Sequence, residues 1–263
     1  MKSKPLFSLV LSMVIFGTVG IFRRYLPFSS EMIAFSRGMI GFLFLAGFLW
    51  LKKQQFDFSK IKKSFPILCL SGALMGFNWI LLFEAYNYTS VAVATLCYYM
   101  APVFVIAVSP FLFKEKIGKK RIFCIAAAVL GMVLVSEPGN IGFDGASQLP
   151  GVLLGLGAAV LYASVVLLNK KNADVPPFEK TVVQLGSAAA VLLPYTAITG
   201  GFSFVEAKPA AFLLLAAVGI IHTGLAYVLY FGSIGALSAQ TTALLSYIDP
   251  AVAVILSFAI LGE

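Results

Sequence analysis

Residues 91–113 read VAVATLCYYMAPVFVIAVSPFLF, a run of 23 residues without a charged side chain. A bilayer core about 30 Å thick needs about 17–25 such residues in a helix, so this stretch is long enough to cross a membrane. Its apolar residues do not alternate with polar ones, which excludes a strand of a membrane barrel. The stretch therefore predicts a transmembrane helix and an all-α membrane fold.

The same pattern recurs along the chain and predicts nine spans in all. They cover residues 7–26, 32–51, 65–83, 91–113, 121–136, 152–168, 182–198, 211–230 and 239–261. The composition agrees, since 60% of the residues are hydrophobic and 11% are charged, against about half and about a quarter in soluble domains. The apolar start is predicted to be a retained first helix, because Arg23 and Arg24 follow it without a small-residue cleavage site.

The basic residues predict the orientation and a multi-pass protein of the inner (plasma) membrane. With the N-terminus in the cytoplasm, the cytoplasmic segments carry Lys2, Lys4, Lys52, Lys53, Lys60, Lys62, Lys63, Lys114, Lys116, Lys119, Lys120, Arg121, Lys170, Lys171 and Lys180. The opposite side receives Arg23, Arg24 and Lys208. This is the positive-inside bias. The net charge of +8 is thus spread over several short loops, which argues against a nucleic-acid partner.

An internal repeat relates residues 76–115 to residues 224–263. At an offset of 148, nine of the 40 aligned positions are identical, including Tyr99/Tyr247 and Pro102/Pro250. The copies lie five spans apart, and an odd number turns the second copy upside down. The sequence therefore predicts two inverted halves, residues 1–137 and 151–263, as in transporters that work by alternating access. The alternative is a duplication kept for packing alone.

Several motifs of this repeat resemble a known family. Residues 83–90 (FEAYNYTS), 101–103 (APV) and 114–115 (KE), with the counterparts 249–252 (DPAV) and 261–263 (LGE), resemble the EamA-type repeat of the drug/metabolite transporter superfamily. The resemblance implies ten helices in two inverted five-helix halves and export of amino acids or related metabolites. The counterpart of the fifth helix would begin beyond Glu263, so a truncated sequence is favoured over a nine-helix variant.

The repeated prolines are the first pointer to a binding site. Pro102 and Pro250 are predicted to kink the fourth and ninth spans and to expose the carbonyls of Tyr98 and Ser246. Paired interruptions in the two halves mark the binding sites of transporters. The alternative is a kink that only shapes packing.

Charged and titratable residues within the spans are the next candidates, because ionisable groups are costly in a membrane. Asp249 is interpreted as a proton-coupling or substrate-ammonium site, or as an interhelical hydrogen-bonding group. Arg37 is interpreted as a partner for a substrate carboxylate, or as a structural bridge to Asp249 or Glu84. His222 either relays protons or is hydrogen-bonded within the bundle. Glu84 is a further proton-coupling candidate or a residue of the outer rim.

Aromatic residues within the spans are predicted to line the cavity, since an aromatic wall suits an ammonium group or an amphipathic solute. The set comprises Tyr98, Tyr99, Tyr162, Tyr227, Tyr230 and Tyr247, with Asn78 and Trp79 beside it. Glu115 and Glu263 are expected to cap or gate the ends of paired helices.

The function predicted from these features is secondary active export of amino acids or related small metabolites, with proton coupling as one option. Exchange of phosphorylated or nucleotide-linked sugars is the alternative, and a non-transporting scaffold is a distant one. The sequence has one histidine, no H-E-x-x-H motif and no carboxylate pair within a span, so we expect no enzyme, metal or cofactor. The expected partners are a small molecule and the lipid bilayer, with the protein a monomer or homodimer.

Overall fold

The computed structural model describes residues 3–53, 58–89, 91–114, 118–119, 122–123, 125–127, 129–130, 149–202, 208–256 and 259–260. The helices with defined bounds are α1 (Ser3–Gly17), α2 (Val19–Arg24), α3 (Ser30–Leu51), α4 (Phe58–Tyr88), α5 (Val91–Tyr98), α6 (Ala101–Phe113), α8 (Leu149–Lys171), α9 (Pro177–Ile198), α10 (Pro209–Ala217), η2 (Val218–Leu225), α11 (Ala226–Ile234), α12 (Ala239–Leu245) and α13 (Ile248–Leu256). The described residues contain helices and no strand, which confirms the predicted all-α fold.

Six helices among the described residues are long and apolar enough to cross a membrane. They are Ser30–Leu51, Ile61–Ala85, Leu96–Phe113, Leu149–Lys171, Pro177–Ile198 and Pro209–Ile234, and Lys4–Gly17 is a shorter apolar helix. The protein is therefore a polytopic membrane protein, as predicted. Most of the predicted fifth span, 121–136, lies outside the described residues, as do Glu115 and Glu263.

Three predicted spans are broken rather than continuous. The first span splits into α1 and α2 at a turn on Thr18, whose hydroxyl donates to the Ile15 carbonyl at 2.7 Å. The fourth span breaks between α5 and α6, and the ninth breaks between α12 and α13. The last two breaks are separated by the same 148-residue offset as the sequence repeat, because α5 begins at Val91 and α12 at Ala239.

The two prolines lie in the first turns of helices, and not in the middle of kinked helices as the sequence predicts. Pro102 is the second residue of α6 and Pro250 is the third residue of α13. In the first turn a helix does not use the backbone N–H that proline lacks, so neither residue costs a hydrogen bond there. The Ser246 carbonyl also accepts the Asp249 N–H at 3.3 Å, so it is not exposed as predicted.

The eighth span contains a π-helical segment, η2, which the sequence analysis did not predict. A π-helical turn leaves a carbonyl without its usual partner, and the Thr223 hydroxyl donates to the Val218 carbonyl at 3.1 Å, five residues back. The wider turn places His222 and Thr223, both buried, toward neighbouring helices. Such segments occur often at functional sites.

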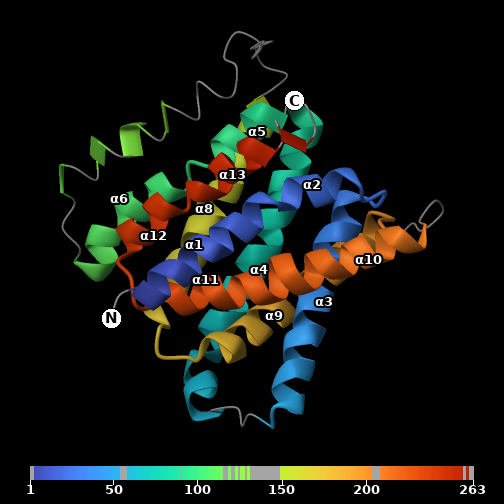
Figure 1. Cartoon of the computed structure of the whole chain (residues 1–263), viewed down its shortest axis with the longest axis horizontal. Coiled ribbons are helices and arrows are strands. Elements are labelled where there is room, and N and C mark those ends of the chain that lie inside the picture. The colour runs from blue at the N-terminus through green and yellow to red at the C-terminus, as the bar shows by residue number, and fades with distance from the viewer. Residues whose placement is uncertain are drawn as a thin grey trace.

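Several contacts between helices of the two sequence repeats have a counterpart in which the repeats are exchanged. Helix α4 packs on α8 and α9, while α1 and α3 pack on α11 and η2. In the same way α5 and α6 pack on α8, while α12 and α13 pack on α1. Figure 1 shows α1 and α11 running side by side across the centre of the bundle. The centre of the protein is therefore built by both halves.

The ends of α3 and α9 that carry basic residues meet at one end of the bundle. The Phe48 ring near the end of α3 stacks on the Phe178 ring at the start of α9, with 5.4 Å between centroids. Lys52 lies over Phe48, and Lys180 is buried with its ammonium 3.4 Å from the Asn172 carbonyl oxygen. This clustering is what the positive-inside pattern requires of one membrane face.

Candidate functional site

The two broken helices touch at their breaks. Tyr99 follows α5, and Tyr247 is its counterpart after α12. The Tyr247 hydroxyl donates to the Tyr99 carbonyl over 3.4 Å, so the interruption of one half rests on that of the other. Irregular backbone within a membrane is tolerated where it is buried in protein or lines a cavity. The breaks thus mark the centre of the candidate site.

A second pair of equivalent residues stacks nearby. Trp79 of α4 and Tyr227 of α11, also 148 positions apart, lie with ring centroids 6.3 Å apart and planes 20° from parallel. Both side chains are buried. Two residues related by the repeat can touch each other only near the axis that relates the halves. This pair therefore places the aromatic centre at the junction of the two halves.

Further aromatic side chains extend this pair into one cluster. Tyr227 stacks on Phe231 with centroids 5.1 Å apart, and Phe16 of α1 lies 5.2 Å from Tyr227. Tyr230 stacks on Tyr162 of α8 at 6.4 Å. Tyr162 in turn lies 5.7 Å from Tyr98, which neighbours Tyr99 at 5.8 Å. Five of the six predicted tyrosines thus belong to one aromatic cluster with Trp79, Phe16 and Phe231, and Tyr247 joins it through its hydrogen bond to the Tyr99 carbonyl.

Arg37 supplies the positive charge of the cluster. Its guanidinium carbon lies 4.6 Å from the centroid of the Trp79 ring, which is a cation–π contact. Its Nε donates to the Thr223 hydroxyl at 3.1 Å. Arg37 therefore binds Trp79 and Thr223, rather than forming the predicted structural bridge to Asp249 or Glu84. The half-buried guanidinium keeps further donors for another ligand.

Asp249 supplies the negative charge from the first turn of α13. It comes two residues after Tyr247, whose hydroxyl donates to the Tyr99 carbonyl, so it lies where the two breaks meet. Helix α1 approaches closely here, because a Cβ on Gly17 would lie 2.7 Å from the Asp249 carbonyl oxygen. The site thus combines one cation and one carboxylate beside the same aromatic cluster.

His222 links the π-helical segment to the break in the first span. Its Nε2 lies 2.8 Å from the Thr18 hydroxyl, and its ring lies edge-on to Phe22 at 4.6 Å. The side chain is buried. This is the hydrogen-bonded arrangement that the sequence analysis weighed against proton relay. Thr18 was missed there, because a threonine after a glycine does not reveal its partner in the sequence.

Asn78 and Glu84 lie toward the edge of the cluster or away from it. The Asn78 amide is buried and donates to the Ala158 carbonyl at 2.7 Å, so it joins α4 to α8. Glu84 accepts from the Tyr195 hydroxyl at 3.0 Å and from the Asn87 amide at 3.3 Å. These contacts place Glu84 at the end of the bundle where α4 and α9 stop, which fits the rim rather than the centre.

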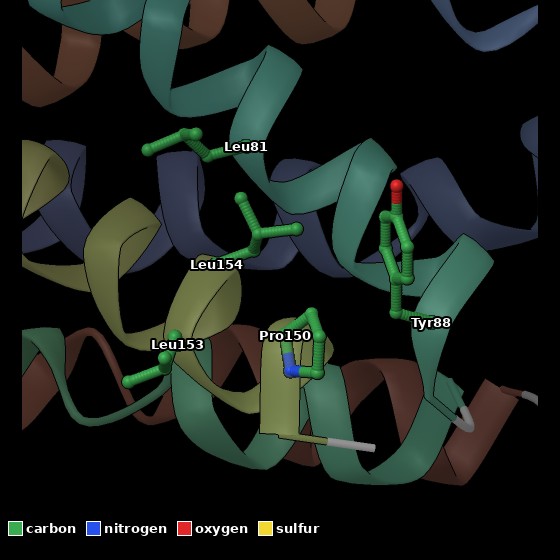
Figure 2. A pocket seen from close by; sticks show the side chains of 5 residues that line it. All are labelled: Leu81, Tyr88, Pro150, Leu153 and Leu154. Atoms are coloured by element: carbon green, nitrogen blue, oxygen red, sulfur yellow. The ribbon is translucent and has the colours of Figure 1, made fainter. Parts of the chain in front are cut away.

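An apolar groove lies apart from this cluster, between the end of α4 and the start of α8. It encloses about 560 Å³ and is lined by Leu81, Tyr88, Pro150, Leu153 and Leu154. Figure 2 shows Leu154 and Pro150 of α8 on the side of Leu81 and Tyr88 of α4, with Leu153 farther from them. The groove carries one polar group, the Tyr88 hydroxyl, and none of the predicted site residues. The aromatic cluster, which gathers the predicted residues, is therefore the candidate site.

The fold is that of a multi-pass membrane protein, and comparison with known proteins gives its class, a membrane transporter. The EamA-like transporter family matches residues 3–137 and 149–263, so the chain belongs to this family. A relative from Bacillus subtilis (strain 168), the "Uncharacterized transporter YxxF", is 33% identical over 99% of this chain and 83% of its own length. An "Uncharacterized transporter" from Clostridium kluyveri is 28% identical over 97% of this chain and 85% of its own.

A solved structure shows the same fold. A crystal structure covers 100% of this chain and 91% of its own chain with a TM-score of 0.87, at 15% sequence identity. Family membership makes the substrate a small molecule carried across a membrane.

Proposed function

We propose that the protein exports amino acids or related small polar metabolites across the plasma membrane, with its N-terminus in the cytoplasm. One observation carries the substrate class: the break of the ninth span brings a carboxylate, Asp249, beside the aromatic cluster, and Arg37 brings a guanidinium over the Trp79 ring of the same cluster. An amino acid bears a carboxylate and an ammonium group a few ångströms apart. The guanidinium is a two-point donor for the former, and a carboxylate beside aromatic rings suits the latter.

Alternating access is the mechanism that this arrangement favours. The equivalent pairs Trp79/Tyr227 and Tyr99/Tyr247 lie where the halves, residues 1–137 and 151–263, meet. Exchanging the conformations of two inverted halves would open the shared centre first to one side and then to the other. The exchanged contacts between helices of the two halves support this proposal, since each half can take the role of the other.

Exchange of phosphorylated or nucleotide-linked sugars is the alternative. A phosphate group carries up to two negative charges and is held in proteins by several cationic or N–H donors. Arg37 is the cation that the described residues bring to the cluster. One guanidinium opposed by the Asp249 carboxylate favours a zwitterion over a dianion.

Trp79 offers a direct test of binding, because the chain has two tryptophans and Trp50 is 78% exposed at the end of α3. A Trp50→Phe protein keeps Trp79 as its single tryptophan reporter. We expect saturable quenching of its fluorescence by members of an amino-acid panel. Saturation by sugar phosphates instead would support the alternative function.

Pairs of ligands that differ in one charged group test which ligand group each of the two protein charges binds. The Trp50→Phe protein should bind an amino acid more tightly than the corresponding amide, and Arg37→Gln should remove this preference. The expected loss is about 10–100-fold, since hydrogen bonds to charged groups contribute about 1.5–3 kcal/mol. Asp249→Asn should likewise remove the preference for the amino acid over its deaminated acid. Lys208→Gln, at an exposed lysine before α10, is the charge-matched control and should change neither.

A further inference from the structure

The cytoplasmic part of the ninth span carries polar side chains along one face. Ser238, Thr242 and Ser246 are spaced by four residues, so they follow one another along α12, and Asp249 comes three residues later. Ser238 is the N-cap of α12, where its hydroxyl accepts the Thr241 N–H at 3.1 Å. We call Ser238, Thr242 and Ser246 the hydroxyl stripe. It leads from the end of the span to the carboxylate at the centre of the site.

The stripe contains a buried hydroxyl without a hydrogen-bond partner. Thr242 is 0% exposed, and its Oγ1 has no partner among the described residues. Ser246 lies one turn further and donates to the Thr242 carbonyl at 2.9 Å, so it does not satisfy that hydroxyl. A buried polar group left unpaired is costly, and water is its usual partner.

Tyr230 provides a second such hydroxyl where the stripe meets Asp249. Its side chain is fully buried, and its hydroxyl faces Ser246 and Tyr162 without a well-formed hydrogen bond to either. Polar groups that face one another beyond direct hydrogen-bonding distance are commonly bridged by water. Ser246 therefore neighbours both the Tyr230 hydroxyl and Thr242, which precedes it by one helical turn.

A lysine lies at the Ser238 end of the hydroxyl stripe, away from Asp249. The Lys170 ammonium donates to the Leu237 carbonyl at 2.6 Å, next to Ser238, and lies 5.2 Å from the Phe113 ring centroid. A fixed positive charge repels a metal cation entering a low-dielectric region. A proton can pass along hydroxyls and waters without any ion moving through. The groups that share the electrostatic surroundings of Asp249 are Arg37 and the tyrosines 98, 227 and 230.

We propose that the hydroxyl stripe, Tyr230 and bridging waters form a proton path between Asp249 and the end of the ninth span at Ser238. The inference rests on the proposed transport function, whose energy source it specifies. A proton arriving from the Ser238 end neutralises the Asp249 carboxylate. Each hydroxyl or water on the way releases one proton and receives one, so no other group changes its charge.

The test measures charge displacement after a pH jump, without any substrate, on proteoliposomes adsorbed to a solid-supported membrane. We expect a transient in the native protein and none in Asp249→Asn. Thr242→Val and Tyr230→Phe keep side-chain volume and remove one hydroxyl each. Both variants should displace the same total charge as the native protein, but at a rate about tenfold lower. A tenfold lower rate corresponds to the loss of about one hydrogen bond.

Thr181→Val is the matched control, because Thr181 is equally buried but its hydroxyl already donates to the Pro177 carbonyl at 2.6 Å. It should relax at the native rate although it loses this hydrogen bond, and thermal unfolding should show that all variants are folded at the temperature of the assay. Native rates in both Thr242→Val and Tyr230→Phe would overturn the path. So would a full transient in Asp249→Asn, or an equal transient after a sodium jump at constant pH. Absence of any transient in a native protein that still releases substrate would overturn the path while leaving the proposed function intact.

Discussion

Gly17 is the point where helix α1 passes the break in the ninth span most closely. A Cβ at this position would lie 2.7 Å from the Asp249 carbonyl oxygen and 2.7 Å from the Val252 Cβ. Both are atoms that cannot rotate away, because one belongs to the backbone and the other is fixed to it. We predict that Gly17→Ala forces α1 away from α13 and shifts the carboxylate of the site.

The expected magnitude follows from two opposing terms. Overpacking of this kind costs about 1–3 kcal/mol. Replacing glycine by alanine in a helix returns about 1 kcal/mol. For a chain of this size a change of 1 kcal/mol moves the melting temperature by about 2–4 °C. The net cost is about 0–2 kcal/mol, so we expect Gly17→Ala to lower the melting temperature by up to about 8 °C. It should also weaken substrate binding by about tenfold or more, since small misplacements of binding groups are costly.

Gly47 provides the control for this prediction. It lies within α3, and a Cβ built on it would meet nothing within 4 Å. Gly47→Ala should therefore raise the melting temperature slightly and leave binding unchanged. The assay is thermal unfolding in detergent, followed by fluorescence, together with the Trp79 binding titration. Equal melting temperatures and affinities in the two variants would refute the reasoning, because steric contact with the break would then have no effect.

Three further changes test other parts of the site. Thr223→Val removes the hydroxyl that accepts from Arg37 and donates to Val218, so thermal unfolding should show a loss of about 1–3 kcal/mol; an unchanged melting temperature would contradict this. Trp79→Ala should cost about 3–5 kcal/mol in the same assay and abolish binding in a radioligand assay, because it removes the centre of the stack; retained binding would exclude the cluster as the site. Tyr195→Phe breaks the hydrogen bond to Glu84 near the rim. It should change stability by less than about 1 kcal/mol and leave transport rates intact. A large loss of transport would instead give Glu84 a role in the mechanism.

Much of the fold could be predicted from the sequence because a membrane leaves few solutions. Long apolar runs have to be helices, so spans such as Ser30–Leu51 and Pro177–Ile198 follow from hydropathy and differ only at their ends. The breaks were harder to predict. Pro102 and Pro250 indicated irregular backbone correctly, but whether a helix bends around a proline or restarts at it depends on the packing of both helices.

The residues of the candidate site could be predicted from the sequence, but their hydrogen-bond partners could not. The tyrosines, Trp79 and Arg37 are unusual in spans, and the structure brings them together. Their partners come from distant helices, so Thr18 beside His222 and Thr223 beside Arg37 could not be read from one sequence. The π-helical segment was also hidden, because no single residue type specifies the extra residue in its turn.

The most direct test of the account is release of a labelled amino-acid and metabolite panel from proteoliposomes, with and without an imposed pH gradient. The account predicts release of one chemical class of zwitterionic solutes, faster with the gradient and slowed strongly by Arg37→Gln and Asp249→Asn but not by Lys208→Gln. Release of phosphorylated solutes instead, or release of zwitterions that is indifferent to both charges, would contradict it.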